Sequence, residues 1–289
     1  MKLALGTVQF GIPYGVANKG SQVKREEAAN ILAYAREAGI DTLDTAISYG
    51  TSEQCLGEAG INGYKIITKV PVLPAEIGEI YGWLANEVEG SMERMNVTSL
   101  YGVLLHHSND LLSRRGRELS RAMIRLKREG SVKKIGVSVY SPTELEGVLS
   151  TLDVDLVQAP LNLVDRRLIT SGWLQRLHER AIEIHTRSAF LQGLLLMPRN
   201  AIPPRFERWD ELWDSWHRVL GEAQMTAVSA CLKYPLSFTE IDRVVIGVEN
   251  REQLHQAVVV AGSHCPTRDW SMLESEDEKL INPTNWASL

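Results

Sequence analysis

Four polar residues follow apolar stretches of the sequence at points where strands are expected to end. Asp44 and Tyr49 stand in LDTAISYG, Lys69 in KIITKV and His106 in LYGVLLHH. In a parallel barrel the carboxyl ends of all strands open onto one mouth, so residues far apart in sequence meet there. The pattern therefore predicts that a carboxylate, a phenol, an ammonium and an imidazole share one site.

Together, these residue types could form a general acid that protonates a carbonyl oxygen. A free tyrosine has a pKa of about 10, too high for ready proton donation at neutral pH. A lysine ammonium beside the phenol would lower that pKa, and a carboxylate would hold the ammonium in place. A neutral histidine would orient the carbonyl oxygen. Such a proton donor is needed where a hydride is transferred to the carbonyl carbon.

Each of these residues also has a purely structural interpretation. Asp44 could cap a turn, Tyr49 could pack within one, and Lys69 could belong to a buried ion pair. His106 could be a hydrogen-bonded core histidine, with its neighbour His107 simply exposed. Taken singly, each structural interpretation is the more common one. The coincidence of four placements at strand ends favours the site.

Eight short apolar segments alternate with longer amphipathic ones along the chain. Most of the apolar segments are nearly continuous, as in parallel strands covered on both faces. The expected strands are 2–8, 40–45, 64–70, 99–106, 132–139, 154–160, 182–188 and 242–248. Helical spacing marks 23–39, 75–95, 114–130, 141–152 and 251–262.

This alternation predicts an α/β fold, a (β/α)8 TIM barrel that forms one domain over residues 1–289. An open doubly wound sheet is the alternative, but no G-x-G-x-x-G follows the first strand.

Two segments have less certain roles. Residues 196–216 carry three prolines and three tryptophans after the seventh strand. They could form a flap facing the substrate, or a helix packed on the barrel through its tryptophans. The acidic run 271–280 is expected to be a solvated, helix-like tail face.

Size, charge and cysteine content narrow the functional class. A chain of 289 residues fits one barrel, which commonly has about 250. The net charge of −5 gives no reason to expect nucleic acid or an anionic membrane as a partner. Cys55, Cys231 and Cys265 are too scattered for a disulfide framework or a zinc site. No stretch approaches the roughly 18 apolar residues of a membrane span, so a cytoplasmic protein is expected.

Five stretches resemble the aldo-keto reductase family, in order along almost the whole chain. They are LGTVQFG, GIDTLDTAISYGTSEQCLG, IITKV, LYGVLLHH and IGVSVYSPTEL. The resemblance implies a (β/α)8 barrel, a nicotinamide cofactor extended across its mouth, and no metal. It also implies a catalytic tetrad of Asp44, Tyr49 as proton donor, Lys69 and His106.

The same resemblance implies a set of cofactor contacts. The expected positions are Gly6, Thr7, Ser138, Gln158, Arg187, Ser188, Gly247, Asn250, Arg251 and Gln253. Four positions in these regions depart from the family pattern. Val139 replaces the usual asparagine, and Arg187 replaces the aromatic residue that stacks on the nicotinamide. Glu249 stands where a serine is common, and Ala257 where an asparagine is.

The choice of cofactor depends on the residues after the eighth strand. Arg251 and the start of a helix there would attract the 2′-phosphate of NADP(H), whereas Glu249 would repel it. One arginine and a helix start should outweigh one partly solvated glutamate. The sequence therefore predicts NADP(H) over NAD(H).

The expected activity is reduction of an aldehyde or ketone to an alcohol. A pocket edged by Arg187, His107, Asn162 and Arg199 would suit a hydroxylated or sugar-like carbonyl substrate. The alternative is a nicotinamide-binding regulatory or scaffold subunit with little turnover. Nothing in the sequence specifies the oligomeric state.

Overall fold

The strands form a closed parallel barrel in the order β1 to β8, in a computed structural model that describes residues 1–18, 20–263 and 269–289. The strands are β1 (Leu3–Gly6), β2 (Thr42–Asp44), β3 (Lys65–Val70), β4 (Leu100–Leu105), β5 (Val132–Ser138), β6 (Leu156–Pro160), β7 (Glu183–Arg187) and β8 (Arg243–Gly247). Each lies within a predicted segment, so the (β/α)8 barrel is confirmed. Cys265 lies outside the described residues.

Closure of the barrel brings the first and last strands together. Gly6 of β1 lies opposite both Asp44 of β2 and Gly247 of β8. A Cβ atom on Gly6 would stand 3.1 Å from Cγ1 of Val245, so the absence of a side chain on Gly6 lets β1 lie this close to β8. The carboxyl ends of β1, β2 and β8 therefore meet at one mouth.

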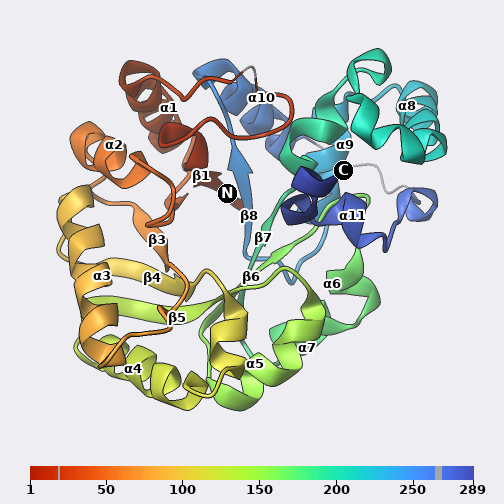
Figure 1. The fold of residues 1–289 in the computed structure, drawn as a ribbon. Helices are drawn as coiled ribbons and strands as arrows, with labels where there is room; N and C mark the ends of the chain where they lie inside the picture. Colours follow the sequence, from red (N-terminus) through yellow and green to blue (C-terminus); the bar gives the residue numbers. More distant parts are fainter. Residues whose placement is uncertain (19, 264–268) are drawn as a thin grey trace.

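Helices surround the strands (Figure 1). They are α1 (Arg25–Glu37), α2 (Ser52–Ala59), α3 (Ile80–Met95), α4 (Gly116–Arg128), α5 (Leu145–Thr151), α6 (Arg167–Thr170), α7 (Trp173–Glu179), α8 (Asp210–Ala223), α9 (Ala227–Leu236), α10 (Arg251–Gly262) and α11 (Glu278–Ile281). The five predicted helical segments contain α1, α3, α4, α5 and α10. In the described part of the chain, no helix is long and apolar enough to cross a membrane.

Local signals explain where two of these helices begin. The Glu79 side chain accepts the Tyr81 backbone N–H at 2.9 Å, which starts α3 later than predicted. Before α5, Ser141 and Glu144 form a capping box around a short 3-10 turn that holds Pro142.

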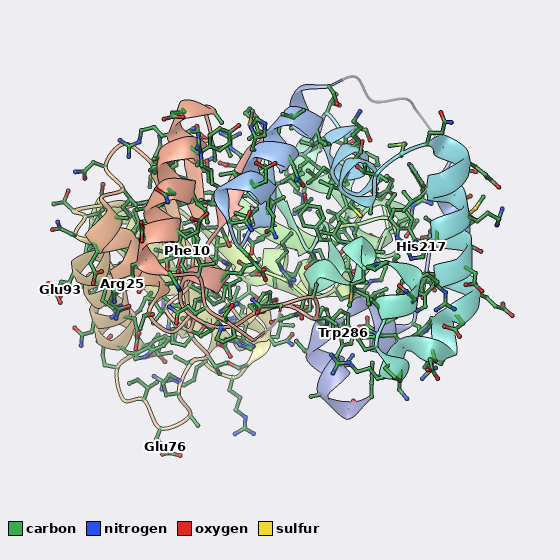
Figure 2. All side chains as sticks on the ribbon, turned by 90° about the horizontal axis from the view of Figure 1, so that it is seen from above. Phe10, Arg25, Glu76, Glu93, His217 and Trp286 are labelled. Carbon is green, nitrogen blue, oxygen red and sulfur yellow. The ribbon has the colours of Figure 1, made fainter. Side chains whose placement is uncertain are left out.

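Residues 196–216 pack against the barrel through their tryptophans. Trp213 and Trp216 are buried, and their indole N–H groups donate to the Phe206 and Leu195 carbonyls at 2.9 and 3.1 Å. The packing interpretation therefore holds for these two tryptophans. Figure 2 shows α8, with His217, at one edge of the molecule, and Glu93 on α3 at the opposite edge.

The acidic run 271–280 is solvated along part of its length, with Glu276 and Glu278 exposed, but it is also anchored by buried leucines. Leu273 and Leu280 are buried, and Trp286 beyond them packs edge-on against Phe206 with ring centroids 4.9 Å apart. Three carboxylates of the run pair with arginines: Glu274 with Arg166 and Glu278 with Arg167 after β6, and Asp277 with Arg208 in the segment after β7. This pairing fastens the tail to the barrel, and periodicity alone gave no sign of it.

Candidate active site

A cavity of about 610 Å³ opens at the carboxyl ends of the strands. Its wall includes residues of β1, β2, β5, β6, β7 and β8, of the loops after β1 and β7, and of α10. Asp44, Tyr49 and His106 all line it, as the strand-end argument predicted. Its volume lies within the roughly 300–1,000 Å³ of small-molecule sites.

Asp44 and Lys69 form a buried ion pair next to this cavity. The Lys69 Nζ donates to Asp44 Oδ2 at 2.7 Å and to the Thr45 carbonyl at 2.8 Å. The other carboxylate oxygen, Oδ1, accepts from Nε2 of Gln158 at 2.6 Å. The two charged side chains are only 1% and 5% exposed. Burial lowers the pKa of Lys69, and Asp44 opposes that shift.

Tyr49 lies against this pair and keeps its proton. Lys69 Nζ is 5.1 Å from the centroid of the Tyr49 ring. Burial and the charge of Asp44 raise the pKa of Tyr49, whereas Arg187 lowers it. Arg187 thus joins Lys69 as a cation near the phenol, a contribution that the sequence did not indicate. At neutral pH the phenol is a hydrogen-bond donor that still holds its proton.

His106 contacts Tyr49 edge to face, with ring centroids 5.7 Å apart. Its Nδ1 hydrogen-bonds to Ser48 Oγ at 3.2 Å. Burial, followed by the charges of Lys69, His107 and Arg187, lowers the pKa of His106 to about 3. The ring is therefore neutral at physiological pH. His107 is exposed and does not line the cavity.

The predicted polar edge of the pocket is only partly present. Asn162 is fully buried and donates from Nδ2 to the Ser188 carbonyl at 3.1 Å. Arg199 pairs with Asp210 and Asp214 at 2.9 and 2.6 Å. Of the four residues proposed for this edge, Arg187 alone lines the cavity. The expectation is therefore wrong for Asn162, Arg199 and His107.

The chain matches the model of the Aldo/keto reductase family over residues 2–278. It belongs to the aldo-keto reductase family. Uncharacterized oxidoreductase YqkF of Bacillus subtilis is 25% identical over 93% of this chain and 93% of its own length. An aldo-keto reductase of Gibberella moniliformis is 27% identical over 67% of this chain and 63% of its own.

Solved structures agree with the fold. The holo form of aldo-keto reductase AKR11C1 from Bacillus halodurans has a TM-score of 0.73 at 20% identity, covering 92% of this chain and 88% of that one. Glycerol dehydrogenase AKR11B4 from Gluconobacter oxydans has a TM-score of 0.71, also at 20% identity, covering 93% and 89%. Aldo-keto reductases are oxidoreductases that use nicotinamide cofactors, and this chain is accordingly an oxidoreductase.

Most of the expected cofactor positions of this reductase line the cavity. They are Gly6, Thr7, Ser138, Gln158, Arg187, Ser188, Gly247 and Gln253. Gln158 also has a contact within the protein that the sequence did not reveal. Its side-chain amide N–H donates a hydrogen bond to the Asp44 carboxylate. It is a positioning residue for the Asp44–Lys69 pair.

Asn250 and Arg251 do not line this cavity, and Arg251 instead lines a second, smaller one with Tyr34, Glu252 and His255. Asn250 caps α10 by accepting the Gln253 backbone N–H at 2.9 Å. The Arg251 guanidinium lies 5.2 Å from the centroid of the Tyr34 ring, and its backbone N–H donates to Glu27 Oε1 at 2.7 Å. The first N–H of α10 therefore already has an anionic partner.

Two loops join to form part of the cavity wall. Gln192, after β7, accepts the Val16 backbone N–H at 2.9 Å and donates from Nε2 to the Tyr14 hydroxyl at 3.0 Å. Gly15 and Gly193 both have positive φ, and a Cβ on Gly193 would stand 2.8 Å from that of Ala17. Only glycine permits this close approach.

Sequence reasoning missed Tyr14, Tyr140 and Gln192 as cavity residues. Tyr140 follows β5 so closely that the strand-end argument could have found it. Tyr14 and Gln192 lie within irregular loops, where no periodicity marks the direction of a side chain.

The polar side chains of the cavity wall suit the binding of a nicotinamide dinucleotide. Gln9 lines the cavity, and its Oε1 is buried without a hydrogen-bond partner in the described structure. Buried polar atoms are nearly always paired, so this atom favours a ligand that donates to it. Ser138 at the end of β5 and Gln253 on α10 would contact the two ends of the cofactor. Among the residues that the structure describes, no group of acidic, His or Cys side chains is arranged to hold a metal ion.

The His106 ring is expected to stay neutral from pH 8 down to about pH 4, because its pKa is lowered from the usual 6.5 to about 3. Nitrogen-15 NMR of the imidazole would measure its titration. The His106 signal would be assigned by its absence from the spectrum of a His106→Gln variant. A midpoint near the ordinary histidine value would contradict the burial and charge argument.

Proposed function

We propose that this reductase converts an aldehyde or ketone to an alcohol, with Tyr49 as the proton donor. The observation that carries the proposal is the joint placement of a protonated phenol, a neutral imidazole and the Asp44–Lys69 pair at one cavity. The raised pKa of Tyr49 keeps its proton available for donation, and the lowered pKa of His106 keeps its ring neutral, as carbonyl reduction at neutral pH requires.

A bound reduced nicotinamide supplies hydride to the carbonyl carbon. Tyr49 donates its phenolic proton to the carbonyl oxygen. The charge left on the phenol is compensated by the Lys69 ammonium, which Asp44 and the Thr45 carbonyl hold beside the ring. His106 has Nδ1 engaged by Ser48, which leaves Nε2 to orient the substrate oxygen.

A panel of carbonyl compounds tests this function, with the absorbance of reduced nicotinamide as the readout under NADH and under NADPH. Turnover of any member with rates typical of enzymes supports the reductase. Tight cofactor binding without turnover across the panel would instead favour the regulatory or scaffold subunit.

We also propose that NADH is preferred over NADPH, which reverses the preference predicted from sequence. The prediction depended on Arg251, and its guanidinium lies over Tyr34 outside the cavity wall. Glu249 does line the cavity, and Glu27 occupies the first N–H of α10. Two carboxylates repel a 2′-phosphate, whereas a carboxylate can accept hydrogen bonds from the ribose hydroxyls of NADH.

Replacing Glu249 with Gln is expected to improve NADPH binding about tenfold, equivalent to about 1.4 kcal/mol, because it removes the repulsion. Fluorescence titration would give the Kd of each cofactor. Glu252→Gln is the matched control, since Glu252 is exposed in the first turn of α10 but does not line the cavity. Tighter wild-type binding of NADPH than NADH, or equal effects of both substitutions, would contradict the proposal.

A further inference from the structure

Arg187 is a cation in the cavity wall that has no acidic partner. Among the described residues that line the cavity, it is the only lysine or arginine. Its Nη2 donates to the Val139 carbonyl at 3.0 Å and its Nη1 to Ser188 Oγ at 3.2 Å. Both acceptors are neutral oxygens, and no ion pair within 4.0 Å is found for it in the described part of the chain.

The carboxylate nearest the reacting groups cannot serve as that partner. Both oxygens of Asp44 are already engaged, one by Lys69 at 2.7 Å and the other by Gln158 at 2.6 Å. A half-buried guanidinium without a counter-ion carries a desolvation cost that an incoming anion would offset.

The position of Arg187 is fixed by the surrounding structure. Ser188, the next residue, has a left-handed backbone with φ of 63°, which is uncommon for a non-glycine residue. The buried Asn162 side chain holds this turn by donating to the Ser188 carbonyl at 3.1 Å. On the other side, the guanidinium carbon lies 4.9 Å from the centroid of the Tyr140 ring. Such strain is typical of sites where a side chain must be held ready.

Arg187 is also close to the groups proposed to react. Its charge lowers the pKa of Tyr49, Lys69 and His106, so it acts on three of the four tetrad members. Arg187 lines the same cavity as Tyr49 and His106, so an anion held by Arg187 would lie in the same chamber as the carbonyl.

We propose that Arg187 binds an anionic group, a carboxylate or a phosphate, on the carbonyl substrate of this enzyme. The inference depends on the proposed reductase function and narrows its substrate class to oxo acids or phosphorylated carbonyl compounds. A guanidinium has five N–H donors, of which two are engaged here, so donors remain for a charge-assisted contact to an anion.

Matched substrates test the proposal. The kcat/KM for 4-oxobutanoate should exceed that for butanal by about 10- to 100-fold, in keeping with hydrogen bonds to charged groups. Glyceraldehyde 3-phosphate against glyceraldehyde gives the same comparison for a phosphate. Arg187→Gln should remove most of this preference, chiefly through KM, and Arg187→Lys should retain part of it. Arg128→Gln is the control, because Arg128 is exposed at the end of α4.

Two results would overturn the inference. If the wild-type enzyme reduces the neutral members as efficiently as the anionic ones, the proposed function stands and the anion site is rejected. If Arg187→Gln weakens cofactor binding and leaves the substrate preference unchanged, Arg187 serves the cofactor instead.

A binding measurement separates this inference from the proposed function. Succinate cannot be reduced in this way, yet calorimetry should detect its binding to the wild-type protein and its loss in Arg187→Gln. Binding of succinate without turnover of any carbonyl would support the anion site while rejecting the reductase function. No binding at millimolar succinate would reject the site.

Discussion

Replacing Tyr49 with phenylalanine is expected to lower kcat for carbonyl reduction by about 10²–10⁴-fold, the usual effect of losing a general acid. The substitution keeps the ring that packs against His106 and Lys69 and deletes only the hydroxyl. The raised pKa of Tyr49 means that wild-type enzyme holds this proton at neutral pH, so its loss should be felt across that range. Steady-state kinetics at saturating cofactor would measure the effect.

Cofactor binding should remain close to that of the wild type in Tyr49→Phe, because the ring is retained. Tyr81→Phe provides the matched control, since the Tyr81 hydroxyl bonds to Glu129 on the outside of the barrel. Turnover of Tyr49→Phe at the wild-type level would remove Tyr49 from the mechanism.

Replacing Lys69 with methionine is expected to abolish most activity and to destabilise the fold by about 3–5 kcal/mol. The methionine fills similar space but leaves the Asp44 carboxylate buried with only Gln158 as a charge-neutral partner for its oxygens. Denaturant unfolding would give the stability, and kinetics corrected for the folded fraction would give the activity.

The double variant Lys69→Met with Asp44→Asn separates structure from catalysis. Removing both charges should restore much of the stability, because no unpaired buried charge remains. Activity should stay low, since the cation beside Tyr49 is still missing. If Lys69→Met instead retained full activity per folded molecule, the ion pair would be purely structural.

The barrel and the convergence of the tetrad could be predicted because both depend on regular features of the sequence. Nearly continuous apolar runs fix the eight strands, and the end of each strand fixes which residues face the mouth. Asp44 and Lys69 are adjacent because β2 and β3 pair, and His106 follows β4, which pairs with β3 in turn.

The direction of side chains at irregular positions could not be predicted in the same way. Arg251 opens α10, but whether it faces the cavity or Tyr34 depends on how α10 packs on α1. Nothing in the sequence indicates partners for the tail residues Glu274 and Glu278, yet arginines far along the chain pair with them. These contacts are set by tertiary packing and leave no periodic pattern.

The contact of Gln192 with Val16 and Tyr14 has a kinetic consequence. Two hydrogen bonds hold the loops after β1 and β7 together along the cavity, and Gly193 lets the second loop lie close to Ala17 of the first. If a long ligand binds behind these joined loops, they must separate before it can leave. Loop opening then contributes to the dissociation rate constant, and release of the product ligand can limit turnover.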